Sequence, residues 1–237
     1  MWVEVLTDND APKIPMQKMA ITKKEVYEIR LIVWETRYVP LVDGDKVDIW
    51  VKVTFDPTGW PEDQVEKKTD THNGSKTGWG QFNWRFKFDL EVPCDFPRIK
   101  FNIHDAGFIT DEAIGESTIN LKRSINKLEK EGFVEVPKTY ISFKHPNKGD
   151  EDRGILMFSM TILPKEDADA EPVGEAQEEP NENPTLKKPT AGRGFGDLMP
   201  SISLNLDFSW NPFGKYLYWI LAAALLAFLF AFAFVLK

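Results

Sequence analysis

Hydrophobic and polar residues alternate along much of this chain of 237 residues, up to residue 163. In residues 47–55 apolar side chains occupy every second position, and residues 81–89 repeat the pattern with aromatic side chains. A period of two is typical of β-strands that bury one face. The pattern predicts eight strands, at residues 26–34, 47–55, 65–72, 81–89, 98–104, 113–121, 132–143 and 154–163.

Turn-forming residues separate the expected strands. The run Asp-Gly-Asp at residues 43–45 follows the first strand, and a Gly-rich stretch at residues 73–80 precedes the fourth. Short strands divided by such turns favour an all-β fold, which we expect to be an eight-stranded antiparallel sandwich over residues 25–164. Residues 1–24 are then a lead-in segment, and the charged residues Lys122–Glu131 are compatible with a short helix.

A change of composition follows the sandwich. Eight acidic residues and one basic residue lie in residues 165–183, and several prolines and glycines come after them. Because residues 165–200 lack periodic apolar positions, we expect an acidic, proline-rich, disordered linker. Residues 201–215 are apolar and aromatic, and two interpretations stay open: a juxtamembrane segment within the lipid headgroups, or a disordered stem.

The most hydrophobic stretch of the chain is residues 216–236, which contain no charge, proline or glycine. A helix of this length reaches about 31 Å, against a hydrocarbon core of about 30 Å. Lys215 and Lys237 flank it. We expect one transmembrane helix that acts as a C-terminal anchor, with the body in the cytosol at the plasma membrane or on cytoplasmic vesicles. A single cysteine fits a reducing compartment.

Neither catalysis nor nucleic-acid binding is indicated by the residues. The three histidines have no metal-ligand spacing, and the chain has no nucleophile motif and no glycine-rich phosphate loop. The formal net charge is −8, and no basic stripe is present that would follow a nucleic-acid backbone. The sequence therefore predicts a non-enzymatic protein that does not bind nucleic acid.

Two acidic loops offer candidate metal ligands. Asp43, Asp45 and Asp48 lie between the first two expected strands, and Asp105 and Asp111 lie after the fifth. Ca²⁺ takes six to eight oxygen ligands, and carboxylates from neighbouring loops at one end of a sandwich could supply them. Bound Ca²⁺ would also reverse the charge of the loops and attract anionic headgroups. The alternative is that these acids are simply solvated loop residues.

The order of these features is similar to that of a known family. The strand VYEIRLIVWET, the acidic loop, VDIWVKVTF, the block from TDTH to FNWRFKF and the run RIKFNIHDAGFITDEAIGES resemble a C2 domain. The opening MWVEV and the tail before the expected anchor resemble the last C2 domain of ferlins, and the resemblance covers nearly the whole chain. It implies an eight-stranded C2 sandwich, a cytosolic body and a role in Ca²⁺-linked vesicle fusion or membrane repair.

The resemblance also implies a metal-loop pattern that this chain meets only in part. Asp105 matches the first acid of the second loop and Asp111 matches the later one, but Gly107 stands where the family has another acid. In the first loop Asp48 matches, and the choice between Asp43 and Asp45 stays open. The missing carboxylate argues for weak or lipid-assisted Ca²⁺ binding, or for none. Ferlins also carry several C2 domains, whereas this chain holds one.

Residues that could touch lipid follow from the same resemblance. Phe108 and Ile109 would cap the second loop and insert between headgroups, or else fold back onto the domain. Lys52, Lys67 and Lys68 lie on polar faces of adjacent expected strands, where they would bind phosphoinositides or form a solvated face. The expected partners are an anionic phospholipid membrane and other C2 domains or fusion proteins. The alternatives are a Ca²⁺-independent protein-interaction domain and a mere spacer for the anchor.

Overall fold

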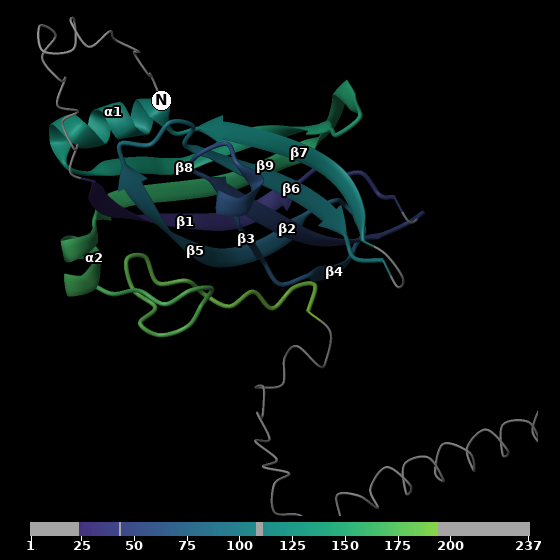
Figure 1. Cartoon of the computed structure of the whole chain (residues 1–237). Helices are drawn as coiled ribbons and strands as arrows, with labels where there is room; N and C mark the ends of the chain where they lie inside the picture. Colours follow the sequence, from purple (N-terminus) through teal and green to yellow (C-terminus); the bar gives the residue numbers. More distant parts are fainter. Residues whose placement is uncertain (1–23, 43, 108–110, 194–237) are drawn as a thin grey trace, which may run out of the picture. The chain divides into compact units, whose positions relative to one another are not determined.

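The computed structural model describes residues 24–42, 44–107 and 111–193 (Figure 1). Nine strands, two α-helices and one 3₁₀ helix follow one another in this part of the chain. In chain order they are β1 (Glu25–Arg37), β2 (Val47–Asp56), η1 (Pro61–Asp63), β3 (Val65–Lys68), β4 (His72–Ser75), β5 (Gly80–Val92), β6 (Arg98–Asp105), β7 (Glu112–Asn120), α1 (Lys122–Glu131), β8 (Val134–His145), β9 (Lys148–Pro164) and α2 (Lys165–Ala170).

The strands form an antiparallel path that folds into two layers. The order along the path is β3-β2-β6-β7-β8-β9-β1-β5, and β4 pairs with β2 beside β3. The path is weakest between β7 and β8, where the one paired position is Glu116 with Lys144. Aromatic contacts cross from one half of the path to the other, as Phe55 on β2 packs 5.5 Å from Phe88 on β5. The expected all-β antiparallel sandwich is therefore confirmed.

The alternating sequences form the strands that they predict. On β2 the apolar positions are buried, with Val47, Ile49 and Val51 completely inaccessible to solvent. On β5 the phenylalanines are buried in the same core, and the residues between them point away from it. Burying a large apolar side chain stabilises a fold by about 1.5–3 kcal/mol, so these two faces make a large part of the stability.

The sandwich has nine strands and not the expected eight, because the expected strand 65–72 ends at Lys68 and a further strand, β4, begins at His72 and enters the expected Gly-rich turn. At Thr69 the side-chain Oγ1 accepts the Val51 N–H at 3.0 Å, and the Thr69 N–H donates to the Val51 carbonyl at 3.0 Å. This exchange replaces one regular step of the ladder and separates the end of β3 from the start of β4. Helix α1 forms at the expected residues, buries Ile125 and Leu128, and ends at Gly132 with a φ of 72°.

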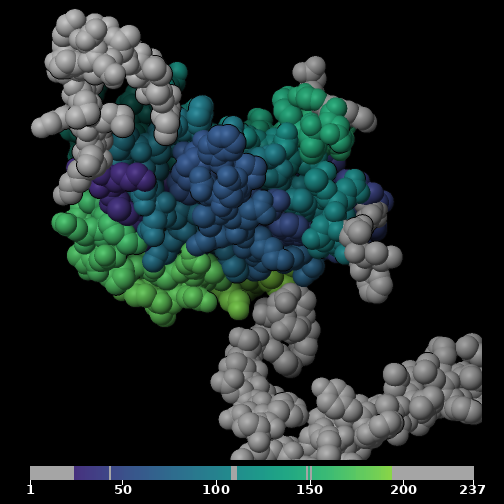
Figure 2. Space-filling view, in the orientation of Figure 1, coloured from purple at the N-terminus to yellow at the C-terminus, as the bar shows by residue number. Residues whose placement is uncertain are grey.

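The expectation of a disordered linker is wrong for residues 165–193, which we call the strap. After α2 the strap lies along the outer face of β1 and β5, and Figure 2 shows it as a continuous green layer on one side of the domain. Ala168, Val173 and Leu186 are at most 3% exposed. The segment has few apolar residues, but each of these three is buried against the sheet.

Arg85 on β5 shows why the strap is ordered. The residue is 1% exposed, and its guanidinium donates to the main-chain carbonyls of Gly174, Glu182 and Pro184 at 3.3, 2.7 and 2.6 Å. Arg85 and Ala176 also exchange backbone hydrogen bonds of 3.1 and 2.8 Å. Hydrogen bonds to charged groups contribute about 1.5–3 kcal/mol each, so this side chain compensates for the missing apolar positions.

Several expectations lie outside the described residues: the lead-in segment up to residue 23, the remainder of the linker, the juxtamembrane segment 201–215 and the helix 216–236. Within the described ranges, no helix has the length and apolar character needed to cross a bilayer. The described residues up to 193 belong to a compact unit that extends from Met1 to Gly196.

Candidate functional site

The expected metal loops meet at one end of the sandwich, which we call the loop end. Asp48 is the second residue of β2 and Asp105 ends β6, and the register places Asp105 opposite Ile49. Asp105 Oδ1 accepts the Asp48 N–H at 2.6 Å, and the Asp48 carbonyl accepts the Ala106 N–H at 2.8 Å. Asp48 Oδ1 accepts the Gly74 N–H from β4. These carboxylates therefore fasten β2, β4 and β6 together.

The other predicted ligands are spread more widely. Asp45 is exposed in the first loop, and Asp43 lies outside the described residues. Asp111 lines a cavity of about 330 Å³ together with Trp50, Lys68 and Asp70. The structure thus brings Asp48 and Asp105 together and leaves Asp45 and Asp111 outside this pair.

A Ca²⁺ ion needs more oxygen ligands than this pair supplies. Among the described residues, no group of three or more Asp, Glu, His or Cys side chains is placed to hold a metal ion. One carboxylate oxygen of Asp48 and one of Asp105 already accept hydrogen bonds from backbone N–H groups. The described residues therefore show no complete set of side-chain ligands for the ion.

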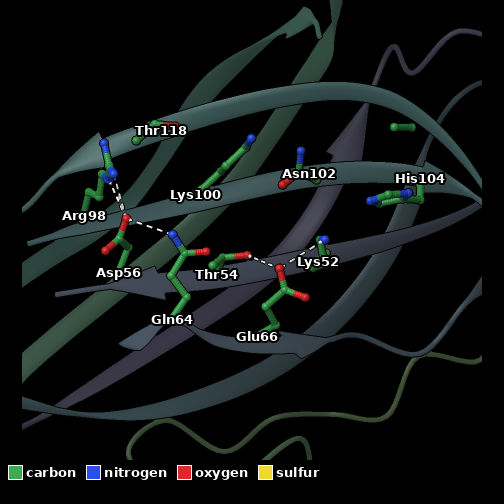
Figure 3. A pocket seen from close by; sticks show the side chains of 11 residues that line it. Lys52, Thr54, Asp56, Gln64, Glu66, Arg98, Lys100, Asn102, His104 and Thr118 are labelled. Atoms are coloured by element: carbon green, nitrogen blue, oxygen red, sulfur yellow. Dashed lines mark hydrogen bonds and ion pairs between the residues drawn. The ribbon is translucent and has the colours of Figure 1, made fainter. Parts of the chain in front are cut away.

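A second candidate site is a groove on the outer face of β2, β3, β6 and β7, with a volume of about 540 Å³ (Figure 3). Its cations come from strand positions that point away from the core, and acidic side chains accompany each one. The pairs are Lys52 with Glu66 at 3.3 Å, Lys100 with Glu116 at 2.8 Å and Arg98 with Asp56 at 2.8 Å.

These ion pairs differ in how firmly they are held. Asp56 is 4% exposed and accepts further hydrogen bonds from the Gly59 N–H and the Gln64 side chain, so its pair with Arg98 secures the following loop. Burial alone raises the pKa of Asp56, but Arg98 and these donors outweigh it and hold the pKa below its usual value. The pairs of Lys52 and Lys100 are solvent-exposed, and such pairs are worth at most about 1 kcal/mol. Both lysines can exchange their carboxylates for a phosphate.

The groove reaches the loop end at His104. Its ring stacks on Trp50 with centroids 4.2 Å apart and an interplanar angle of 10°. Both ring nitrogens are buried, and neither has a hydrogen-bond partner among the described residues. Burial and then the charge of Lys52 lower the pKa of His104 below its usual value, so the ring is neutral at pH 7. Lys68 lies over the Trp50 ring, with its Nζ 5.5 Å from the ring centroid.

Of the three lysines expected on one lipid-facing surface, Lys67 lies elsewhere. The register pairs Lys68 with Lys52 on the outer face, but it pairs Lys67 with Val53, whose side chain is in the core. Lys67 Nζ reaches across the edge of the sandwich to the Lys87 carbonyl at 2.8 Å and to the Glu175 carboxylate. Adjacent strand residues face opposite sides, so Lys67 and Lys68 could not share a surface.

The contribution of β6 to the groove was not predicted from the sequence. Arg98, Lys100, Asn102 and His104 occupy alternate positions of this strand, and all line the groove. The signal is present in the sequence, because Ile99, Phe101 and Ile103 alternate with these residues, and a strand that buries its apolar positions points the intervening ones outward. The predicted lipid-inserting residues Phe108 and Ile109 lie outside the described residues.

Comparison with known proteins agrees with this architecture. Residues 27–136 match the family model of the C2 domain. The chain is 42% identical to Ferlin 2 of Tetrahymena thermophila over 195 residues, which cover 79% of this chain and 11% of that protein. It is 29% identical to Ferlin 1 of Toxoplasma gondii over 198 residues, which cover 83% of this chain and 14% of that protein.

These residues form a C2 domain of the ferlin kind. A C2 domain of plant extended synaptotagmin 1 is a solved structure that also resembles it, with a TM-score of 0.45 and 19% identity over 59% of this chain and 96% of that chain. The chain spans about one tenth to one seventh of the length of these two ferlins. C2 domains as a class bind phospholipid membranes, and many bind Ca²⁺.

Proposed function

We propose that this chain is a non-enzymatic membrane-docking module of ferlin type. Residues 216–236 anchor it in one bilayer, and the outer face of the C2 domain binds anionic phospholipid in vesicle trafficking, fusion or repair. The observation that carries the proposal is the groove of β2 and β6. There Lys52 and Lys100 form ion pairs with solvent-exposed carboxylates, and Lys68 lies beside Lys52 over Trp50.

Charge and shape both suit lipid headgroups. Lys52, Lys68 and Lys100 point outward from neighbouring strands, and each lysine near an anionic surface adds about 1 kcal/mol of attraction. The groove that Lys52 and Lys100 line has a volume of about 540 Å³, which leaves room for a headgroup. The outer face of β1 and β5 cannot offer a comparable surface, because the acidic strap covers it.

Co-sedimentation with vesicles tests the proposal. The compact unit of residues 1–196 should bind phosphatidylserine and phosphoinositide vesicles and not phosphatidylcholine vesicles. The double variant Lys52→Glu, Lys100→Glu should bind about tenfold or more weakly, since two attractive charges become repulsive. The variant Lys122→Glu, Lys130→Glu makes the same charge change on α1 and should bind like the unaltered protein. Equal binding by the two variants would refute the proposal.

Repeating each assay with Ca²⁺ and with EGTA tests the metal ligands. If Asp43, Asp45, Asp48, Asp105 and Asp111 act together at the membrane, Ca²⁺ strengthens binding and Asp111→Asn abolishes the increase. Equal binding with Ca²⁺ and EGTA would assign the loops a purely structural role and leave a Ca²⁺-independent docking domain.

A second candidate function is binding of a protein partner at the opposite end of the sandwich. There a cavity of about 600 Å³ is lined by Val26, Val65 and Cys94. Trp60 and Phe96 in the adjoining loops are 65% and 62% exposed. Exposed aromatic residues around a cavity commonly mark protein contacts. Trp60→Ser should then weaken capture of another C2 domain of ferlin type and leave vesicle binding unchanged.

A further inference from the structure

The strand path has two ends, and β5 forms one of them. Among the described strands β1 is the partner of β5 on one side, so the other edge of β5 has no neighbouring strand. The unpaired N–H and C=O groups of such an edge can bond to an additional strand, unless other parts of the protein cover them. On β5 this cover extends over only part of its 13 residues.

The strap and Lys67 cover the middle of this edge. Arg85 exchanges both of its main-chain hydrogen bonds with Ala176 of the strap, in an antiparallel bridge. Two residues later the Lys87 carbonyl accepts from Lys67 Nζ at 2.8 Å, and Lys67 also contacts the Glu175 carboxylate. Every second residue of a strand directs its N–H and C=O to the same side, so Arg85 and Lys87 show which residues bond outward.

The same alternation directs the main chains of Asp89 and Glu91 to the open edge. The pairing of β5 with β1 has no irregularity from Trp84 to Val92, so the alternation continues over this stretch. In the part of the chain that the structure describes, no backbone hydrogen bond outside that pairing reaches Asp89 or Glu91. Two N–H and two C=O groups therefore stay available along residues 89–92, about 13 Å of edge.

A cavity of about 600 Å³ opens beside this stretch, and Phe55 and Val65 contribute apolar lining to it. Leu90 is completely buried, whereas Asp89 and Glu91 are exposed on the outer face. Side chains of directly opposite strand residues share one face of a sheet. A strand added to this edge would therefore place every second side chain beside Asp89 and Glu91 and direct the intervening one towards the cavity.

The charge around the cavity selects a basic partner. Lys24 is the one basic residue in its lining, and four are acidic: Asp63, Asp89, Glu91 and Asp95. Asp89 pairs with Lys165 at 2.8 Å and Glu91 pairs with Lys24 at 2.6 Å, but all four side chains are at least 36% exposed. Exposed ion pairs are weak, so cations of a partner can replace these lysines. An anionic membrane and a second copy of this chain, with its net charge of −8, are both disfavoured.

We propose that the open edge of β5 binds an extended basic segment of another protein as an added antiparallel strand. Basic side chains of the segment lie beside Asp89 and Glu91, and the apolar side chain between them enters the cavity. The antiparallel direction is the one that the strap adopts where it meets Arg85. This binding mode deepens the second candidate function and rests on it, because it names the chemistry of the partner at this end of the sandwich.

Binding of a designed strand tests the charge requirement. The full chain in a mild non-ionic detergent is titrated into the labelled peptide Lys-Val-Lys-Val-Lys, and fluorescence anisotropy is recorded. Asp89→Asn with Glu91→Gln should weaken binding about tenfold or more, since two ion pairs are lost. Asp152→Asn with Glu151→Gln removes the same charges from exposed positions of β9 and should bind like the unaltered protein. Absence of saturable binding, or equal binding by the two variants, would overturn the proposal.

Methylated peptides separate strand addition from simple charge attraction. Opposite residues of an antiparallel pair exchange both hydrogen bonds or neither, so the lysine amides beside Asp89 and Glu91 face the edge and the valine amides point away. N-methylation of the central lysine should abolish binding, whereas N-methylation of a valine should leave it largely intact. Equal losses from the two modifications, or a greater loss from the valine, would overturn the added strand.

Hydrogen exchange shows whether the edge is open before a partner binds. The amides of Asp89 and Glu91 should exchange quickly in the protein alone and slowly with the peptide bound. The amides of Phe88 and Leu90 point towards β1 and should exchange slowly in both samples. Slow exchange at Asp89 and Glu91 without peptide would mean that another segment of this chain or a second copy already covers the edge, and would overturn the proposal.

The outcomes also separate this binding mode from the second candidate function. Peptide binding without capture of another C2 domain of ferlin type would support the added strand and count against that function. Capture that depends on Trp60 but not on Asp89 and Glu91 would support the function and overturn the added strand.

Discussion

Glu28 on β1 is the carboxylate whose loss should weaken the domain most clearly. Its side chain is 3% exposed, and three cations surround it: Arg30 at 2.9 Å, Lys165 at 3.2 Å and Lys87 at 3.7 Å. It thereby joins β1, β5 and the first residue of the strap. Glu28→Gln keeps the volume of the side chain and removes its charge, which leaves three cations without their shared partner.

The loss of stability expected for Glu28→Gln follows from the burial of the Glu28 carboxylate. Removing one member of a buried ion pair costs about 3–5 kcal/mol, and we expect about 3 kcal/mol because Lys87 and Lys165 retain some contact with water. Urea denaturation of the purified chain in mild detergent, followed by tryptophan fluorescence, measures the loss. With a slope of about 2 kcal/mol/M, the midpoint should fall by about 1.5 M.

A matched control separates burial from charge. Asp152 forms an ion pair of 2.6 Å with Lys144, but the two side chains are 79% and 47% exposed. Asp152→Asn should therefore change the free energy of unfolding by at most about 1 kcal/mol. If Glu28→Gln costs no more than Asp152→Asn, the reasoning from burial is refuted.

The pH dependence of Glu28 gives a second readout. Burial raises the pKa of Glu28, but hydrogen bonds from Arg30 and Lys165, with the charge of Lys87, outweigh burial and lower the pKa below 4.5. The stabilisation by the carboxylate is therefore present above pH 4.5 and is lost as the pH falls further. The difference in stability between the unaltered protein and Glu28→Gln should shrink below that pH. A constant difference from pH 7 to pH 3 would contradict this account.

Three further predictions concern the loop end. Burial, and after it the charge of Arg193, lowers the pKa of His72 below 6.5. The folded protein therefore resists protonation of this ring, and its free energy of unfolding should decline as the pH falls below 6.5. An NMR titration that gives His72 a pKa at or above 6.5 would disprove this. Asp105→Ala should cost about 1–3 kcal/mol in urea denaturation by leaving a backbone N–H unpaired, whereas Asp105→Asn keeps an acceptor and should cost less. Gly78→Ala would place a Cβ 2.1 Å from the Val39 carbonyl oxygen and should lower the thermal midpoint much more than Gly44→Ala, where no atom lies within 4 Å.

The strands were predictable because burial repeats with the period of a strand. β2 and β5 lie within one to three residues of the expected bounds, and helix α1 has the expected ones. The division of residues 65–72 was not predictable in this way. It depends on the Thr69 side chain meeting Val51, a contact between residues that become neighbours only after β2 and β3 have paired.

The strap was missed for a different physical reason. Its order depends on Arg85, Lys87 and Arg30, which bind main-chain carbonyls of the strap, and no side-chain pattern in residues 171–193 reports such bonds. The useful signal lay in β5, where Arg85 and Lys87 alternate with buried phenylalanines and had to point outward from the core. A cationic outer face followed by an acidic segment should have suggested that the two associate.

The candidate site was predicted in part. The pairing of β2 with β6 brings Asp48 and Asp105 together, as expected for acids that close adjoining strands. The prediction that Lys67 and Lys68 share a surface was wrong, because β3 is a polar strand at the edge of the sheet. Such a strand has no alternation of apolar residues that would indicate its register. The pairing of Lys68 with Lys52 became visible only in the structure.

The use of Arg85 to hold backbone carbonyls has a consequence for how this protein can diverge. Every residue type supplies the same carbonyl, so most positions of the strap could mutate without losing the bonds that keep it in place. Selection would act on the arginine and on the strap residues whose side chains are buried, which include Ala168, Val173, Leu186 and Arg193. We therefore expect orthologous chains to retain the strap's path while its sequence drifts beyond recognition, so alignments would mark its presence mainly by an arginine on the sheet.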